Sequence, residues 1–306
     1  MTFTTKIKDE ITKNYINVIE ARSELAALIR YNSKINKIIS ITLENASVAR
    51  RIYKSIKEIF KINPKVIVRN QKRFRIKQIY ILEINEKVDQ ILESLDITNQ
   101  GKKVLPSANS LPSVEEKIAY LQGAFLACGT ISDPATSGYH LEFVFNYKQD
   151  ADYINKLLKE LRINSKITVR NNKQMVYVKS SEDISDIIKM FKASNSLFYF
   201  EDIRIYRDHK NMVNRLNNCE IANQEKTLNT GLKQIEDIKY LKENDIFILL
   251  DEKTQLVANY REKYPESSYQ ELSDIISVET DYKIGKSGIN HHFIKIKKLT
   301  TQHQNK

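Results

Sequence analysis

The stretch YLQGAFLACGT, residues 120–130, decides the fold because an earlier stretch, ELAALIRYNS at residues 24–33, matches it. Both are short, apolar and helical in pattern. When they are aligned at an offset of 96 residues, Ala27 meets Gly123 in the middle of the apolar stripe. Two helices can cross with their backbones nearly in contact only where the side chains at the crossing are this small. The pattern therefore predicts twin central helices in a duplicated domain.

The elements around these two stretches recur in the same order, which supports a duplication. The most similar segments are KINPKVIVRN at residues 61–70 and RINSKITVRN at residues 162–171, identical at six of ten positions. A repeated α-β-β-α-β-β-α unit explains both the order and the spacing; chance similarity of two Lys- and Ile-rich stretches is the alternative. Hydrophobic periodicity predicts strands at 38–45, 65–70, 78–84, 139–146, 165–171 and 174–179, and helices at 46–60, 86–95, 150–161 and 181–191.

Composition bounds the class of protein. The chain has 306 residues, 41% of them hydrophobic, and a formal net charge of +11. Such an excess of positive charge favours a polyanionic partner, nucleic acid or an anionic membrane surface. No apolar run approaches membrane-spanning length, and the polar N-terminus is unlike a signal peptide. The two cysteines, Cys128 and Cys219, lie too far apart to suggest a disulfide framework or a zinc site, which fits a reducing cytoplasm.

The C-terminal segment is predicted to be all helical. Periodicity indicates helices at 226–241 and 250–264. Ser268 with Glu271 forms a capping box that opens a helix to about residue 276, and Ser113 with Glu116 forms the same box before the second central helix. A polar connection at 277–285 then leads to a last helix at 286–299. The apolar stripe of that helix contains Ile289, Phe293, Ile296 and Leu299, which leaves Lys286, Ser287, Asn290, His291 and Lys295 facing outward.

The repeat resembles the LAGLIDADG homing-endonuclease fold. In that family two such helices pair at a pseudo-two-fold axis, two four-stranded sheets cover the DNA major groove, and an acidic residue at each helix end holds a divalent metal. Here the acidic positions fall on Asn32 and Cys128, and the nearest acid, Asp133, lies five residues beyond Cys128. Mg²⁺ requires anionic oxygen ligands. The resemblance therefore implies a scaffold without cleavage chemistry, and no metal or other cofactor is expected.

A narrower resemblance, to the WhiA family of Gram-positive bacteria, covers nearly the whole chain. It rests on residues 120–134 and 138–142, on DHKNMVNRLNNCEIAN at 208–223, and on KSGINH at 286–291. The middle stretch is the most specific. The family joins a degenerate homing-endonuclease domain to a C-terminal helix-turn-helix. The resemblance implies a DNA-binding transcriptional regulator involved in cell division and chromosome segregation, and in sporulation where that occurs.

The helix-turn-helix is expected to read DNA over Ser268 to Thr301, especially with the outward-facing residues of the last helix. In such motifs the second helix enters the major groove, where Asn can pair with adenine and Lys can reach guanine or phosphate. The long connection fits the variant found in the DNA-binding region of sigma factors. Two departures from the family pattern concern Gly285, which replaces the usual serine, and His292 with Ile294, which replace the usual arginines.

Several other residues have both a functional and a structural interpretation. Lys72, Arg73, Arg75 and Arg170 are candidate secondary DNA contacts, although the first three equally suit a solvated hairpin. Cys128 is expected to be a buried small side chain and His140 a structural one. Adjacent histidines on a helix point apart, so His291 and His292 do not predict a metal site. Asn214, Arg215, Asn218 and Glu220 are expected to hold a linker helix by hydrogen bonding.

Together these patterns predict an α+β protein with three parts. Residues 1–205 form the LAGLIDADG-like domain, with repeats at about 1–98 and 113–193. Residues 206–224 form a linker helix, and residues 225–306 form the helix-turn-helix domain. The expected function is sequence-specific binding of double-stranded DNA, in the cytoplasm at the nucleoid, without enzymatic activity. An active homing endonuclease and a protein-interaction scaffold are the alternatives, and protein partners cannot be named from the sequence.

Overall fold

The computed structural model describes residues 1–70, 78–107 and 109–304. The chain divides into two compact units, Met1–Arg207 and Asp208–Lys306. Helix α8, Ser194–Glu243, contributes residues to both. Sequence patterns had predicted a linker helix at 206–224 apart from a helix at 226–241, whereas α8 is continuous through both segments. It contains no proline and a single glycine, so nothing in its sequence interrupts the backbone hydrogen bonds.

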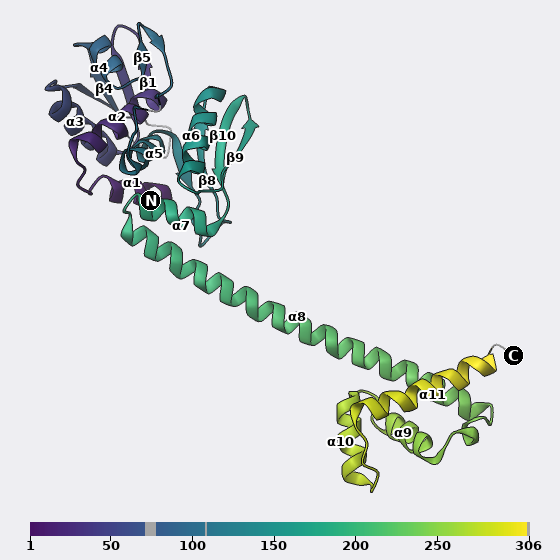
Figure 1. Ribbon diagram of the computed structural model, residues 1–306. Coiled ribbons are helices and arrows are strands. Elements are labelled where there is room, and N and C mark those ends of the chain that lie inside the picture. Colours follow the sequence, from purple (N-terminus) through teal and green to yellow (C-terminus); the bar gives the residue numbers. More distant parts are fainter. Residues whose placement is uncertain (71–77, 108, 305–306) are drawn as a thin grey trace. The chain divides into compact units, whose positions relative to one another are not determined.

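The two central helices are α2, Val18–Asn32, and α5, Val114–Cys128, which pack side by side in the N-terminal unit (Figure 1). Their backbones touch at Gly123. A Cβ atom there would lie 2.1 Å from the Glu24 carbonyl oxygen and 3.0 Å from the Ala27 Cβ. The predicted meeting of Ala27 with Gly123 is confirmed. The capping box of Ser113 and Glu116 begins α5 as expected.

Two four-stranded antiparallel sheets repeat the same topology. Their strand orders are β1-β2-β4-β3 and β7-β8-β10-β9, so β3 and β9 occupy equivalent edges. This confirms the equivalence predicted from the two similar ten-residue segments. The strands are β1 Ser33–Ile35, β2 Ile39–Leu43, β3 Lys65–Asn70, β4 Gln78–Ile84, β7 Gly129–Ile131, β8 Leu141–Phe145, β9 Lys166–Arg170 and β10 Lys173–Val178.

Helices cover one face of each sheet and enclose a single core. α3, Ala46–Phe60, contacts β2 and β4, while α6, Lys148–Glu160, contacts β8, β9 and β10. α1 (Phe3–Ile11), α4 (Val88–Ser94) and α7 (Ser181–Met190) complete the unit. A short hairpin pairs β5, Thr98–Asn99, with β6, Lys102–Lys103, and Gly101, at φ +74°, lies in its turn.

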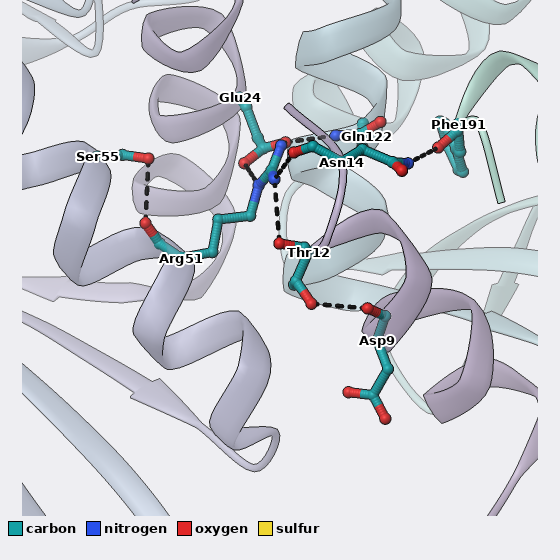
Figure 2. Close-up of polar contacts among 8 residues, drawn as sticks. All are labelled: Asp9, Thr12, Asn14, Glu24, Arg51, Ser55, Gln122 and Phe191. Atoms are coloured by element: carbon teal, nitrogen blue, oxygen red, sulfur yellow. Dashed lines mark hydrogen bonds and ion pairs between the residues drawn. The ribbon is translucent and has the colours of Figure 1, made fainter. Parts of the chain in front are cut away.

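A buried polar network joins the helices of the two repeats (Figure 2). The carboxylate of Glu24 on α2 accepts hydrogen bonds from Arg51 Nε on α3 at 2.6 Å and from Gln122 Nε2 on α5. Arg51 also donates to the carbonyl oxygen of Asn14 at 2.9 Å. Because a buried carboxylate must be paired, this network fixes how α2, α3 and α5 meet.

The C-terminal unit is all helical. It contains the end of α8, a turn of 3₁₀ helix at Phe247–Leu249, α9 (Glu252–Lys263), α10 (Tyr269–Glu279) and α11 (Lys286–Gln304). The capping box of Ser268 and Glu271 is present. α10 is longer than predicted, which shortens the connection to residues 280–285. The core consists of Ile238, Leu241, Ile246, Leu250, Val257, Ala258, Leu272, Ile276, Ile289, Phe293 and Ile296.

Candidate nucleic-acid interface

Helix α11 has one buried face and one exposed face. Ile289, Phe293 and Ile296 pack into the core of the C-terminal unit, as predicted. Leu299 is only half-buried against the same core. The exposed residues follow one another at helical spacing, so they form one continuous surface. From Lys286 to Thr301 they are Lys286, Ser287, Asn290, His291, Ile294, Lys295, Lys297, Lys298 and Thr301.

The orientation of this surface is set by hydrogen bonds through His292, which is buried. Thr254 of α9 donates its hydroxyl hydrogen to Asp251 Oδ1 at 2.7 Å, so it must accept from His292 Nδ1, also at 2.7 Å. The other ring nitrogen, Nε2, then accepts from the Tyr282 hydroxyl at 3.1 Å. This assigns the neutral Nδ1–H tautomer. Burial lowers the pKa of His292, which further favours the neutral ring.

The turn between α10 and α11 is held by serines of α10. Ser273 Oγ donates to the Ile284 carbonyl oxygen at 2.5 Å, and Ser277 Oγ lies 3.4 Å from the same atom. The turn between α9 and α10 is held by Arg261, whose buried guanidinium donates to the carbonyl oxygens of Tyr264, Pro265 and Ser267. Both turns are therefore held by side chains of the C-terminal unit itself.

The residues predicted to read DNA are all exposed, but one of them already forms an ion pair within the protein. Lys286, Ser287, Asn290 and His291 are exposed at the N-terminal half of α11. Lys295 is also exposed, but its ammonium lies 3.3 Å from Asp251 Oδ1. Within the described residues, the ion pair of Lys295 therefore competes with any phosphate contact that it could make.

Three exposed residues of α11 were missed by the sequence reasoning. Ile294 is 56% exposed and lies between Asn290 and Lys297 on the same surface. Lys297 and Lys298 extend the positive charge of this surface toward the C-terminal end of α11. The sequence could have indicated both lysines. They follow Asn290 by seven and eight residues, a spacing that places Asn290, Lys297 and Lys298 on one side of a helix.

This surface has the chemistry of a DNA-reading helix. An exposed asparagine can form a bidentate pair with adenine, and an exposed isoleucine can contact a thymine methyl group. Lysines at the margins of the same surface can meet phosphates on either side of a groove. Two acidic side chains of neighbouring segments lie near this surface: Asp251 beside Lys295, and Asp237 of α8 near Lys297.

The positions that carry metal ligands in homing endonucleases do not fit a divalent cation. Asn32 ends α2 and donates its side-chain amide to the Thr42 carbonyl oxygen at 2.8 Å. Cys128 ends α5, and its thiol lies 3.4 Å from the Ala124 carbonyl oxygen. Burial raises the pKa of Cys128 to about 12, so its sulfur stays protonated and neutral. Neither residue supplies the anionic oxygen that Mg²⁺ requires.

A lysine that sequence reasoning did not select lies at the same helix end. Lys8 of α1 donates to the Leu126 carbonyl oxygen at 3.1 Å and lies over the Phe125 ring. Burial lowers its pKa to about 8, so it remains mostly charged at neutral pH. An ammonium at the C-terminus of a helix interacts favourably with the helix dipole and repels a second cation. Lys8 is thus a further reason why a metal does not fit.

The sheets carry basic residues on the faces that the helices leave uncovered. By strand register, Arg170 of β9 lies on the face opposite the buried Val176. Arg69 of β3 occupies the equivalent position in the first sheet and was not selected from the sequence. Lys72, Arg73 and Arg75 lie outside the described residues. His140 contacts Glu142 at 3.0 Å and stacks on Tyr177, in agreement with a structural role.

The polar residues of the middle of α8 do not behave as expected. Asn214, Arg215, Asn218 and Glu220 are all exposed. Among the described residues, the hydrogen bond from Arg215 to the Asn211 carbonyl oxygen is the only one that these four side chains make, and it lies within α8. The hypothesis that they hold a linker helix against other elements is wrong for the structure described.

No helix of the described residues, α8 included, has the length and apolarity needed to cross a membrane.

The duplicated α/β unit and the all-helical unit, in which one face of the last helix is exposed, define a LAGLIDADG-like protein with a C-terminal helix-turn-helix. Sequence comparison agrees: residues 19–98 match the WhiA N-terminal LAGLIDADG-like domain, 117–210 the WhiA LAGLIDADG-like domain and 213–300 the WhiA C-terminal HTH domain. The chain belongs to the WhiA family.

Similar proteins span its whole length. The chain is 37% identical over 305 residues to the probable cell division protein WhiA of Lactobacillus acidophilus, covering 97% of each. It is 36% identical over 310 residues to the probable cell division protein WhiA of Bacillus subtilis, covering 99% of this chain and 97% of that protein. The crystal structure of full-length WhiA from Thermatoga maritima is similar with a TM-score of 0.58 at 25% identity, covering 99% of both chains.

Proposed function

We propose that this protein is a sequence-specific, non-enzymatic binder of double-stranded DNA that regulates transcription. Its relatives are named cell division proteins, which supports a role in cell division; we extend that role to chromosome segregation. It acts in the cytoplasm at the nucleoid and needs no cofactor. The region from Ser268 to Thr301 contacts DNA, and α11 enters the major groove.

The exposed surface of α11 carries this proposal. Asn290, with Ser287, His291 and Ile294 around it, is the candidate reader of base edges. Lys286, Lys295, Lys297 and Lys298 are the candidate phosphate contacts, with Lys295 the weakest because of its ion pair with Asp251. Arg170 on the uncovered face of the second sheet is proposed as a secondary contact.

The test compares two substitutions on one surface. Asn290→Ala should cost about 1–3 kcal/mol at a specific site and relax the preference at one base pair, because it removes a base contact. Lys297→Ala should weaken binding to all sequences alike and reduce the slope of log K against log salt by about one, because it removes a phosphate contact. Affinity is measured for a mapped site and a scrambled site over a salt series. Lys102→Ala, which changes an exposed lysine of the N-terminal unit, is the control.

Three outcomes would contradict the proposal. If neither affinity depended on salt, the protein-interaction scaffold would be the better account. If both substitutions changed affinity in the same way at both sites, α11 would bind DNA without reading it. If a chain truncated at Leu250 kept both affinity and specificity, the reader would lie in the N-terminal unit instead.

A further inference from the structure

Helix α8 carries a row of apolar side chains that nothing in the described residues covers. Ile205, Tyr206, Met212, Val213 and Leu216 are between 41% and 68% exposed. Single exposed apolar residues are ordinary, but a contiguous row of them on one helix marks an interaction site.

The row follows a heptad pattern. Ile205 and Met212 occupy equivalent positions seven residues apart. His209 lies four residues after Ile205 and three before Met212, and Leu216 lies four residues after Met212. Such spacing places all four side chains on one seam, as in a coiled coil. Arg207 points the other way, because it donates to the Ser137 carbonyl oxygen at 2.9 Å. Phe198, one heptad earlier and 68% exposed, shows that the same side of α8 is open there as well.

The row is complementary to itself when its direction is reversed. A two-fold axis between Lys210 and Asn211 places Ile205 opposite Leu216 of a second copy and His209 opposite Met212. Tyr206 and Val213 occupy equivalent heptad positions on one flank of the seam, and in an antiparallel pair the equivalent flank positions of the two helices face each other.

The charges beside the seam fit the same arrangement. Asp208 and Arg215 occupy equivalent heptad positions on the other flank, so in the antiparallel pair Asp208 of each copy faces Arg215 of the other, twice by symmetry. A parallel pairing would instead stack His209 on His209 and place Asp208 against Val213. Charge and apolarity together therefore favour the antiparallel arrangement.

We propose that two copies of this chain associate through an antiparallel pairing of their α8 helices, about a two-fold axis between Lys210 and Asn211. Ile205, Met212 and Leu216 form its apolar seam, and Asp208 pairs with Arg215 of the other copy. The dimer does not require DNA, so it stands or falls separately from the proposed reading of DNA by α11.

Sedimentation equilibrium of the full chain over a concentration series tests the association. The wild type should reach a dimer, and Leu216→Asp should weaken association at least about tenfold, because it places two charges in the seam. Asn214→Asp, on the opposite side of α8, should leave association unchanged. Circular dichroism should show equal helix content in all three, since each changed residue is exposed. A wild type that remains monomeric at every concentration would overturn the proposal.

Charge reversal tests the pairing of individual residues. Asp208→Arg should weaken the dimer, and the double variant Asp208→Arg with Arg215→Asp should restore it. A double variant that does not recover the dimer would contradict the antiparallel arrangement.

Cross-linking tests the direction of the helices with a native residue. In the antiparallel seam Asp202 lies opposite Cys219 of the second copy, and Cys219 is exposed. Asp202→Cys should therefore form a disulfide-linked dimer on mild oxidation, and adding Cys219→Ser should abolish it. The wild type should form none, because its two Cys219 residues lie far apart in this arrangement. Rapid cross-linking of the wild type through Cys219 would indicate a parallel pair and overturn the proposal.

Discussion

His292 is the residue that sets the position of the candidate reading helix. Its ring joins Thr254 of α9 to Tyr282 in the turn before α11, and it does so as a neutral donor and acceptor. The family pattern usually has an arginine at this position, and from the sequence His292 was only a departure from that pattern. The structure instead gives His292 a positioning role.

Acidification should loosen the C-terminal unit through this residue. Burial lowers the pKa of His292, so the unfolded chain binds the proton more readily than the folded chain. Stability that is present above the ordinary histidine pKa of about 6.5 is therefore lost as the pH falls below it. Amide hydrogen exchange in α9 and α11, corrected for intrinsic rates, should show reduced protection below that pH.

The matched variant for this prediction is His292→Gln, which keeps one donor and one acceptor but does not titrate. Its protection should change much less with pH than that of the wild type. Equal pH dependence in both proteins would assign the effect to another group and contradict the role given to His292.

At the scale of elements, the contact between α2 and α5 is where the N-terminal unit is least tolerant of change. Gly123→Ala adds a Cβ at 2.1 Å from the Glu24 carbonyl oxygen, so the helices must separate. The substitution should lower the free energy of unfolding by about 1–3 kcal/mol, with larger residues costing more. Urea unfolding, followed by circular dichroism, measures it.

Gly138→Ala is the control for that measurement, because a Cβ there meets no atom within 4 Å. It should unfold at the same urea concentration as the wild type. If Gly123→Ala behaved likewise, the close crossing of α2 and α5 would be refuted.

The sequence predicted the repeated elements well because each has a local signal. The bounds of α3, β3 and β4 match their predicted ranges, since apolar periodicity and caps define them. The continuity of α8 was not predicted, although the absence of proline and the single glycine permit it. Lys8 could not have been selected, since it reaches Leu126 from 118 residues away in the chain.

In the candidate site too, features with a local sequence signal were predictable, whereas features that depend on distant contacts were not. The buried stripe of α11 was predictable from spacing, and so was the outward position of Asn290. The ion pair of Lys295 with Asp251 and the hydrogen bonds of His292 depend on how α9 packs against α11, which no local pattern reports.

At the scale of the whole molecule, the N-terminal unit has a LAGLIDADG-like fold, and we expect it to have no nuclease activity. Supercoiled plasmid DNA incubated with Mg²⁺ or Mn²⁺ should remain intact, because the helix ends carry Asn32 and Cys128 where cleavage needs carboxylates. Gel electrophoresis measures this. Reproducible metal-dependent nicking that Asn32→Ala or Cys128→Ala abolished would revive the homing-endonuclease alternative.

Genome-wide chromatin mapping in the host tests the central claim most directly, with the wild type and Asn290→Ala expressed at equal levels. If α11 reads DNA, the wild type should occupy discrete sites that share a sequence motif. Asn290→Ala should lose occupancy at those sites, or relax the motif at one base pair, while the protein remains abundant and folded. An identical set of sites and an identical motif for both proteins, or no discrete sites for the wild type, would contradict the claim.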